Sequence, residues 1–109
     1  MFYMLTCFNL NSDVSIDDFS QSLDQYMSHM KSRELVHSTS GIGSRHSDIG
    51  MDTDSERDHR YFFTTNFVDR PQCEKAVEYI QAHEEPSLTL HKAVYSRVSD
   101  PVFICYADI

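Results

Sequence analysis

The sequence predicts an α+β fold in which two helices cover one face of a four-stranded antiparallel sheet. An apolar strand pattern opens the chain, amphipathic helix patterns follow two of the strand patterns, and another apolar strand pattern closes the chain. The resulting order is βαββαβ, with a short extra helix before the last strand, which is the ferredoxin-like arrangement. A length of 109 residues suits one domain, so we assign residues 1–109 to a single ferredoxin-like domain.

The first strand and the first helix have clear boundary signals. Residues 2–10 are rich in aromatic and aliphatic side chains, which predicts a strand. Apolar residues then recur at helical spacing over residues 16–33. Ser15 precedes this stretch as an N-cap and Asp18 follows it by three residues, a variant of the capping box. We therefore expect a helix over residues 16–33.

The middle of the chain predicts a hairpin with a long acidic loop. Residues 35–46 contain few large side chains and two glycines, which favours a long, bulged second strand. Residues 47–58 carry several acidic side chains and are expected to form the loop. Residues 60–68, RYFFTTNFV, give the clearest strand pattern in the sequence.

The last third predicts two helices and a strand. The second helix is expected to start at Asp69 or Arg70 and to end near His83. Ser87 is expected to cap a third, short helix. Pro101 is expected to end that segment, so that the fourth strand covers residues 102–107.

Large apolar side chains on both phases of the strands predict a homodimer. Helices can cover only one face of the sheet. The closing strand nevertheless carries apolar side chains on both phases, Val102, Ile104 and Tyr106 against Phe103, Cys105 and Ala107. Each large apolar side chain gains roughly 1.5–3 kcal/mol on burial. We therefore expect the open sheet face to pack against a second copy, the alternative being a sparsely apolar face that stays solvated.

Charge and composition exclude several classes of partner. The net charge is −8 and no stretch concentrates Lys and Arg, so we expect neither nucleic acid nor a membrane as a partner. The apolar start is short and has no basic leader, so we do not read it as a signal peptide. Three separated cysteines and no secretory signal favour a cytoplasmic location with free thiols.

Three stretches of the sequence carry a resemblance to a known family. The chain opens with FYMLTCFNL, its first helix pattern ends in MSHMKSREL, and it closes with LHKAVYSRVSDPVFICYADI. In these stretches it resembles a small family of uncharacterised bacterial ferredoxin-like proteins within the dimeric α+β-barrel superfamily. The resemblance implies a dimer. Related barrels include cofactor-independent monooxygenases, haem enzymes and small-molecule binding or degradation proteins, and fold analogy alone does not choose among them.

Three side chains near the C-terminus are the main candidates for a ligand site. His91 can act as an acid or a base near neutral pH, and Tyr95, four residues later, shares its helix face. Arg97 can hold a carboxylate. The plainer alternative is that His91 packs within the helix and that Arg97 makes a surface ion pair. Secondary candidates are His37, Asn9 and Asn66, for which a strand-end hydrogen bond or a surface position is the alternative.

No motif in the sequence specifies a metal or a cofactor. The six histidines include no HExxH or HxxxH spacing, so we expect no metal site and no cofactor. The alternating acids from Asp52 to Asp58 resemble the start of a calcium loop. However, they lack its glycine and its distant glutamate, and Arg57 interrupts them. Gly41 and Gly43 are better explained by a bulge than by phosphate binding.

Three functions remain open on the sequence alone. The first is a homodimeric binding protein whose pocket between the sheet and the helices takes a small apolar or carboxylate-bearing ligand. The second is a cofactor-independent enzyme, resembling a monooxygenase or an isomerase, with His91 as acid or base. The third is a structural or interaction module. A deep pocket with a perturbed histidine favours the second function, and a filled interior favours the third.

Overall fold

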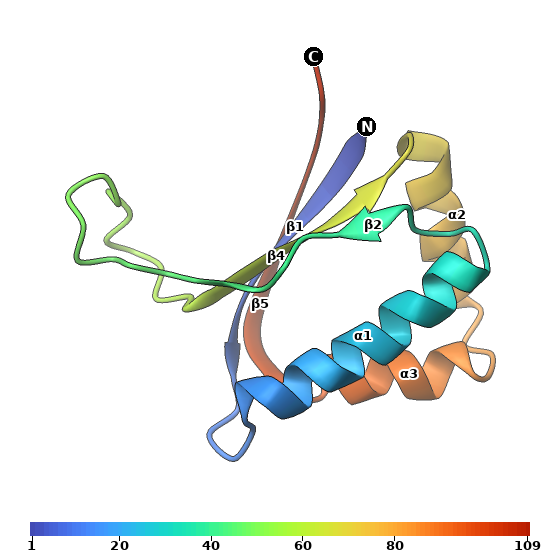
Figure 1. Cartoon of the computed structure of the whole chain (residues 1–109), viewed down its shortest axis with the longest axis horizontal. Helices are drawn as coiled ribbons and strands as arrows, with labels where there is room; N and C mark the ends of the chain where they lie inside the picture. The colour runs from blue at the N-terminus through green and yellow to red at the C-terminus, as the bar shows by residue number, and fades with distance from the viewer.

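The computed structural model describes all residues, 1–109, and confirms the predicted α+β fold. In chain order the elements are β1 (Phe2–Leu10), α1 (Ile16–Ser32), β2 (Ser38–Thr39), β3 (Gly43–Ser44), β4 (Tyr61–Phe67), α2 (Arg70–Gln81), α3 (Ser87–Tyr95) and β5 (Val98–Ala107). The antiparallel sheet has the order β2-β4-β1-β5, and β3 also pairs with β4. The three helices lie on one side of the sheet (Figure 1).

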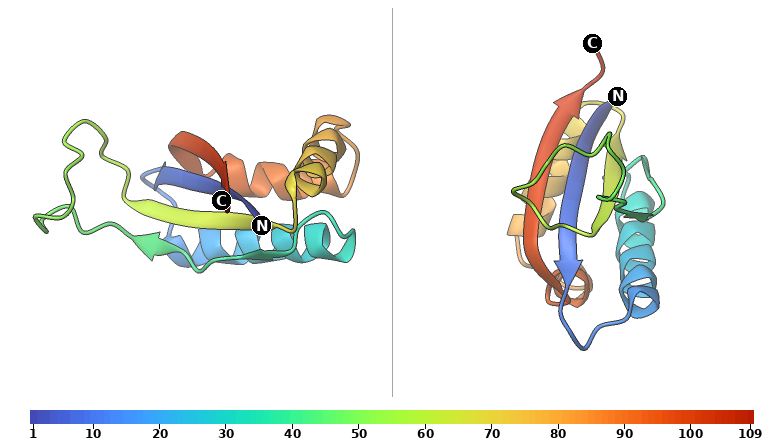
Figure 2. Two further views of the ribbon diagram at one scale, coloured as in Figure 1. Left: turned by 90° about the horizontal axis from the view of Figure 1, so that it is seen from above. Right: turned by 90° about the vertical axis from the view of Figure 1, so that its left-hand side faces the viewer.

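The alternation of side chains along the strands places the core on the helix side. Phe8 and Phe63 are buried there against Phe19 of α1, with ring centroids 4.7 Å apart for Phe8 and Phe19 and 5.8 Å apart for Phe8 and Phe63. Since β1 and β5 pair in register, with Leu5 opposite Ile104, the alternate side chains of both strands share the opposite face. No helix covers that face (Figure 2).

The first two helices begin as the sequence predicts. The Ser15 hydroxyl accepts a hydrogen bond from the Asp18 amide at 3.1 Å, at the start of α1. Asp69 does the same for α2, accepting from the Gln72 amide at 2.9 Å. Each cap satisfies one of the amide groups that a helix start leaves free.

The predicted cap of the third helix is wrong. Ser87 is the first residue of α3 rather than its cap, and its buried hydroxyl has no hydrogen-bond partner. Glu85 takes the acceptor role instead, because its carboxylate accepts from the Thr89 amide at 3.1 Å and from the Thr89 hydroxyl at 2.5 Å. The longer glutamate side chain reaches back to the first turn from a position two residues before the helix.

The predicted second strand is interrupted. Only β2 and β3 are regular, although the segment between them still follows the edge of β4. At Ser40 a side chain takes part in the hydrogen bonding between the strands. The Ser40 hydroxyl accepts from the Thr64 amide at 2.7 Å, while the Ser40 amide donates to the Thr64 carbonyl at 2.9 Å. The hydroxyl takes the place of a backbone carbonyl, which breaks the ladder.

The last strand starts earlier than predicted, and Pro101 lies inside it. β5 is an edge strand, where a proline amide need not join the ladder. Asp100 has a φ of 53°, and the pairing of β5 with β1 shifts register between Cys7 and Asn9. Pro101 therefore belongs to a bulge in β5 and does not end the preceding segment.

Candidate functional site

A cavity of about 410 Å³ lies between the helices and the sheet, where the sequence predicts a pocket. Its walls come from β1, β4, β5 and all three helices, and most of its lining is apolar. The lining residues are Met4, Tyr26, Met27, Met30, Val36, Thr65, Phe67, Ala76, Ile80, His91, Tyr95, Pro101 and Phe103. This volume falls within the range of known small-molecule sites.

Two of the predicted site residues, His91 and Tyr95, line this cavity together. Both belong to α3, and their rings lie 4.7 Å apart between centroids. Tyr26 of α1 meets His91 edge to face at 5.6 Å. The three side chains form an aromatic cluster with polar tips on the helix wall of the cavity.

Burial favours the neutral forms of the His91 imidazole and of the Tyr26 and Tyr95 phenols. Desolvation, with a smaller contribution from the charge of His83, lowers the pKa of His91 below its ordinary value of 6.5. Burial raises the pKa of Tyr26, and it raises the pKa of Tyr95 to about 12. At neutral pH the cavity therefore presents a neutral imidazole and two neutral phenols.

The sheet wall contributes a buried hydroxyl that the sequence analysis missed. Thr65 of β4 is 2% exposed and lines the cavity, and its hydroxyl has no hydrogen-bond partner. A signal was present in the sequence, because Thr65 occupies the phase of Phe63 and Phe67, which both face the core. A polar side chain on a core-facing phase is a candidate for binding something polar.

A second buried hydroxyl lies beside the cavity. Thr6 of β1 is 1% exposed and is not part of the lining. It is close enough to Tyr95 to oppose the rise in the pKa of that phenol, but the two hydroxyls do not reach hydrogen-bond geometry. Thr6 therefore lies near Tyr95 but does not line the cavity.

Arg97 and His37 lie outside the cavity. A guanidinium nitrogen of Arg97 donates to the Ala93 carbonyl in the last turn of α3. The His37 side chain is exposed, and its amide donates to the Asn66 carbonyl at 2.9 Å. The lining contains no Arg, Lys, Asp or Glu, so no permanently charged group faces the cavity.

The two predicted asparagines make hydrogen bonds within the sheet and its loop. Asn9 accepts from the Arg60 amide at 3.0 Å and donates to Asp58 at 3.3 Å. Asn66 donates to the Ser38 hydroxyl at 3.1 Å and accepts from the Thr64 hydroxyl at 2.9 Å. These contacts match the alternative of strand-end hydrogen bonds, and neither residue lines the cavity.

Two further observations concern metals and membranes. The structure contains no group of three or more His, Cys, Asp or Glu side chains arranged to hold a metal ion. Asp52 and Asp54 of the acidic loop pair instead with Arg45 and Arg57. None of the helices has the length and apolar character needed to cross a membrane.

Comparison with known proteins establishes the fold and no specific function. No protein-family model matches the chain, and no curated protein matches it. A crystal structure of an Arabidopsis thaliana protein superposes with a TM-score of 0.75 at 9% identity, covering 100% of this chain and 96% of that one. The chain has a ferredoxin-like fold.

Two other solved structures show how varied such proteins are. A dimeric ferredoxin-like protein of unknown function from Jannaschia sp. has a TM-score of 0.64 at 12% identity, and 98% of each chain is covered. A hydroxynitrile lyase from Passiflora edulis also has a TM-score of 0.64, at 11% identity, with 96% of this chain and 90% of that chain covered. At these identities the likeness concerns the fold alone.

The buried, neutral state of His91 predicts a pH dependence of stability. The unfolded chain binds a proton at His91 more readily than the folded protein, because burial lowers the folded pKa below 6.5. The folded state is therefore disfavoured as the pH falls through about 6.5. We expect urea unfolding to show a smaller stability loss between pH 7.5 and pH 5 for His91→Gln than for the wild type. Parallel losses in the two proteins would contradict this account of the site.

Proposed function

We propose that the protein is a homodimer that binds a small, neutral, largely apolar molecule in the cavity between sheet and helices. The observation that carries this proposal is a largely apolar cavity of about 410 Å³ whose lining has no Arg, Lys, Asp or Glu and includes Thr65, whose buried hydroxyl is unpaired. Leaving a buried hydroxyl without a partner costs about 1–3 kcal/mol. A ligand whose hydrogen-bonding group reaches the Thr65 hydroxyl removes that cost at this position.

The lining also supports a neutral ligand over a carboxylate. A carboxylate transferred into an apolar site needs a cationic or strongly donating partner. Arg97, the candidate for that role, bonds to the backbone of its own helix, and His91 is neutral at pH 7. The carboxylate-bearing ligand considered from the sequence is therefore the weaker alternative.

The open sheet face supports the homodimer. Ile104 is 49% exposed and Tyr106 is 47% exposed on this face, where Tyr106 stacks on Tyr3 at 4.9 Å between ring centroids. Leu5 and Phe62 add partly buried apolar surface. Several proteins of this fold, including the one from Jannaschia sp., are described as dimeric. We propose that two copies pack their open faces together about a two-fold axis.

An enzyme that uses His91 as a general acid or base is the second candidate. It is favoured by the perturbed pKa of a cavity-lining histidine between two phenols. A structural module without a ligand is less well supported, because a largely apolar hollow of about 410 Å³ lies between the helices and the sheet. The monooxygenase and isomerase chemistries considered from the sequence have no specific residue to support them beyond His91.

Binding of matched aromatic probes tests the primary proposal. Benzyl alcohol should bind at least about tenfold more tightly than benzoate or benzylamine, because the lining offers no countercharge. Thr65→Val should weaken benzyl alcohol by about five- to tenfold and leave toluene, which lacks the hydroxyl, unchanged. Isothermal titration calorimetry measures each affinity.

A cavity-filling variant serves as the control for these titrations. Ala76→Phe places a large side chain in the cavity wall and should abolish binding of both benzyl alcohol and toluene. Equal or tighter binding of benzoate would refute the neutral-ligand proposal. Retention of wild-type affinities in Ala76→Phe would show that the probes bind elsewhere.

Turnover of a hydroxynitrile tests the enzymatic candidate. Cleavage of mandelonitrile, followed by benzaldehyde absorbance, is the natural first assay because one protein of the same fold is a hydroxynitrile lyase. If the protein is a lyase, His91→Ala should lower kcat by about 10²–10⁴-fold, the usual contribution of a general acid or base. A rate that is equal in the wild type, in His91→Ala and in buffer would exclude this reaction.

The oligomeric state tests the proposed dimer. Light scattering at micromolar concentration should give twice the chain mass, and Ile104→Asp should give the monomer mass, because it places a charge in the middle of the apolar face. Circular dichroism should show that the variant remains folded. A wild-type protein that scatters as a monomer would refute the packing of open faces.

A further inference from the structure

The acidic loop stands on the same side of the sheet as the uncovered face. We call residues 45–60 the arm. In Figure 1 the arm extends away from the helices, and in the right-hand view of Figure 2 it lies in front of the open face. Cys7, Phe62 and Ile104 of that face share a hollow of about 370 Å³ with side chains of the arm. The arm therefore forms a wall at one end of the open face.

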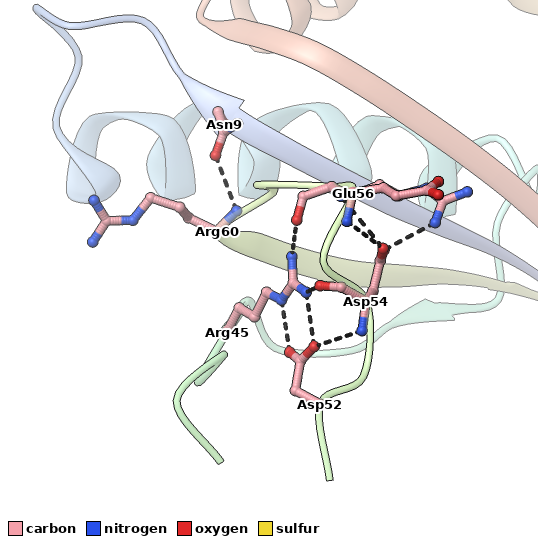
Figure 3. Close-up of polar contacts among 7 residues, drawn as sticks. Asn9, Arg45, Asp52, Asp54, Glu56 and Arg60 are labelled. Atoms are coloured by element: carbon pink, nitrogen blue, oxygen red, sulfur yellow. Dashed lines mark hydrogen bonds and ion pairs between the residues drawn. The ribbon is translucent and has the colours of Figure 1, made fainter. Parts of the chain in front are cut away.

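Arg45 holds the arm in a defined shape (Figure 3). Its guanidinium makes two hydrogen bonds to the Asp52 carboxylate, at 2.7 and 2.8 Å. It also donates to the Asp54 carbonyl at 2.8 Å and to the Arg57 carbonyl at 2.5 Å. The Arg45 side chain is only 11% exposed, and a two-pronged pairing of this kind fixes geometry as well as adding energy.

A second cluster of contacts continues this order within the arm. The Asp54 carboxylate accepts from the amides of Glu56 and Arg57, at 3.0 and 3.4 Å, and pairs with the Arg57 guanidinium at 2.9 Å. These donors lower the pKa of Asp54 to about 2. The arm is therefore a preorganised structure, which reduces the entropy lost when it meets a partner.

The base of the arm is anchored across the sheet. His59 is 7% exposed, and its ring nitrogen lies 2.6 Å from the Asp100 carbonyl of β5. β1 lies between β4 and β5, so this contact bridges β1 near its register shift. Asn9 of β1 holds the neighbouring Arg60 amide at 3.0 Å. These contacts fix the direction in which the arm leaves the sheet.

The arm carries two exposed apolar residues in the turn of residues 47–51, which we call its tip. Ile49 is 56% exposed and Met51 is 89% exposed. Single exposed apolar residues are ordinary, but these two lie on a fixed projection beside an apolar sheet face. The open face and the tip of the arm therefore both carry exposed apolar side chains.

A second copy of this chain suits both surfaces. Phe62 and Ile104 of the open face share a hollow with side chains of the arm, so a sheet placed on that face lies beside the arm. A two-fold axis then places each arm beside the other copy. Arg45 and Arg57 neutralise Asp52 and Asp54, which lets the arm approach another chain of net charge −8 with less repulsion.

We propose that the arm is a clasp that packs its Ile49–Met51 tip against the second copy in the homodimer. This inference rests on the proposed dimer and adds a second contact region to the face-to-face sheet packing. Each dimer contains two such contacts, one from each copy.

The dimer dissociation constant tests the clasp. Sedimentation equilibrium should show that the double variant Ile49→Asp/Met51→Asp raises the dissociation constant at least about tenfold, because it places charges in an apolar contact. Val77→Asp is the matched control, since Val77 is a 45% exposed apolar residue on α2, away from both surfaces. It should leave the dissociation constant unchanged, and circular dichroism should show all variants folded.

Photocrosslinking identifies what the tip contacts. p-Benzoylphenylalanine placed at Met51 should give crosslinked peptides that combine both isotopes when ¹⁴N- and ¹⁵N-labelled proteins are mixed and allowed to exchange. A dimer with an unchanged dissociation constant in the arm variant and crosslinks only within one chain would overturn the clasp and leave the dimer standing. A wild-type monomer would overturn both.

Discussion

The structure depends on one constraint, which is that a sheet has two faces while this chain supplies helices for only one. Phe8 and Phe63 alternate with Leu5 and Phe62 along paired strands, so apolar side chains are divided between the faces. The helix side buries its share around Phe19 and Met30. The other side leaves apolar side chains in contact with water, which is unfavourable.

The face of the sheet that the helices cover also borders a cavity. Ala76 is the one buried residue of α2, and this small side chain leaves space that a larger one would fill. Thr65, His91 and Tyr95 are among the residues that line that space. The lining carries no Arg, Lys, Asp or Glu, and desolvation there lowers the pKa of His91, which is why we propose a neutral ligand.

Features that depend on neighbouring residues could be predicted from the sequence, whereas features that depend on contacts between distant segments could not. Alternation in residues 2–10 and 60–68 gave the sheet faces, and Ser15 and Asp69 gave two helix starts, because each signal acts within a few residues. Pro101 was misplaced because its role depends on β5 being an edge strand. His91 and Tyr95 were found through helical spacing. By contrast, Thr65 belongs to β4 and lines the same cavity only because the chain folds, which residue spacing cannot predict.

The acidic loop shows how the same residues acquire a different meaning in the structure. Asp52 and Asp54 suggested part of a calcium loop, and Arg57 was the residue that did not fit. In the structure, Arg45 and Arg57 satisfy these carboxylates with hydrogen bonds. Charge that would otherwise repel a second acidic copy is thereby used within the arm. The pairing shapes the arm and lowers the unpaired negative charge that it would bring to a second copy in the dimer we propose.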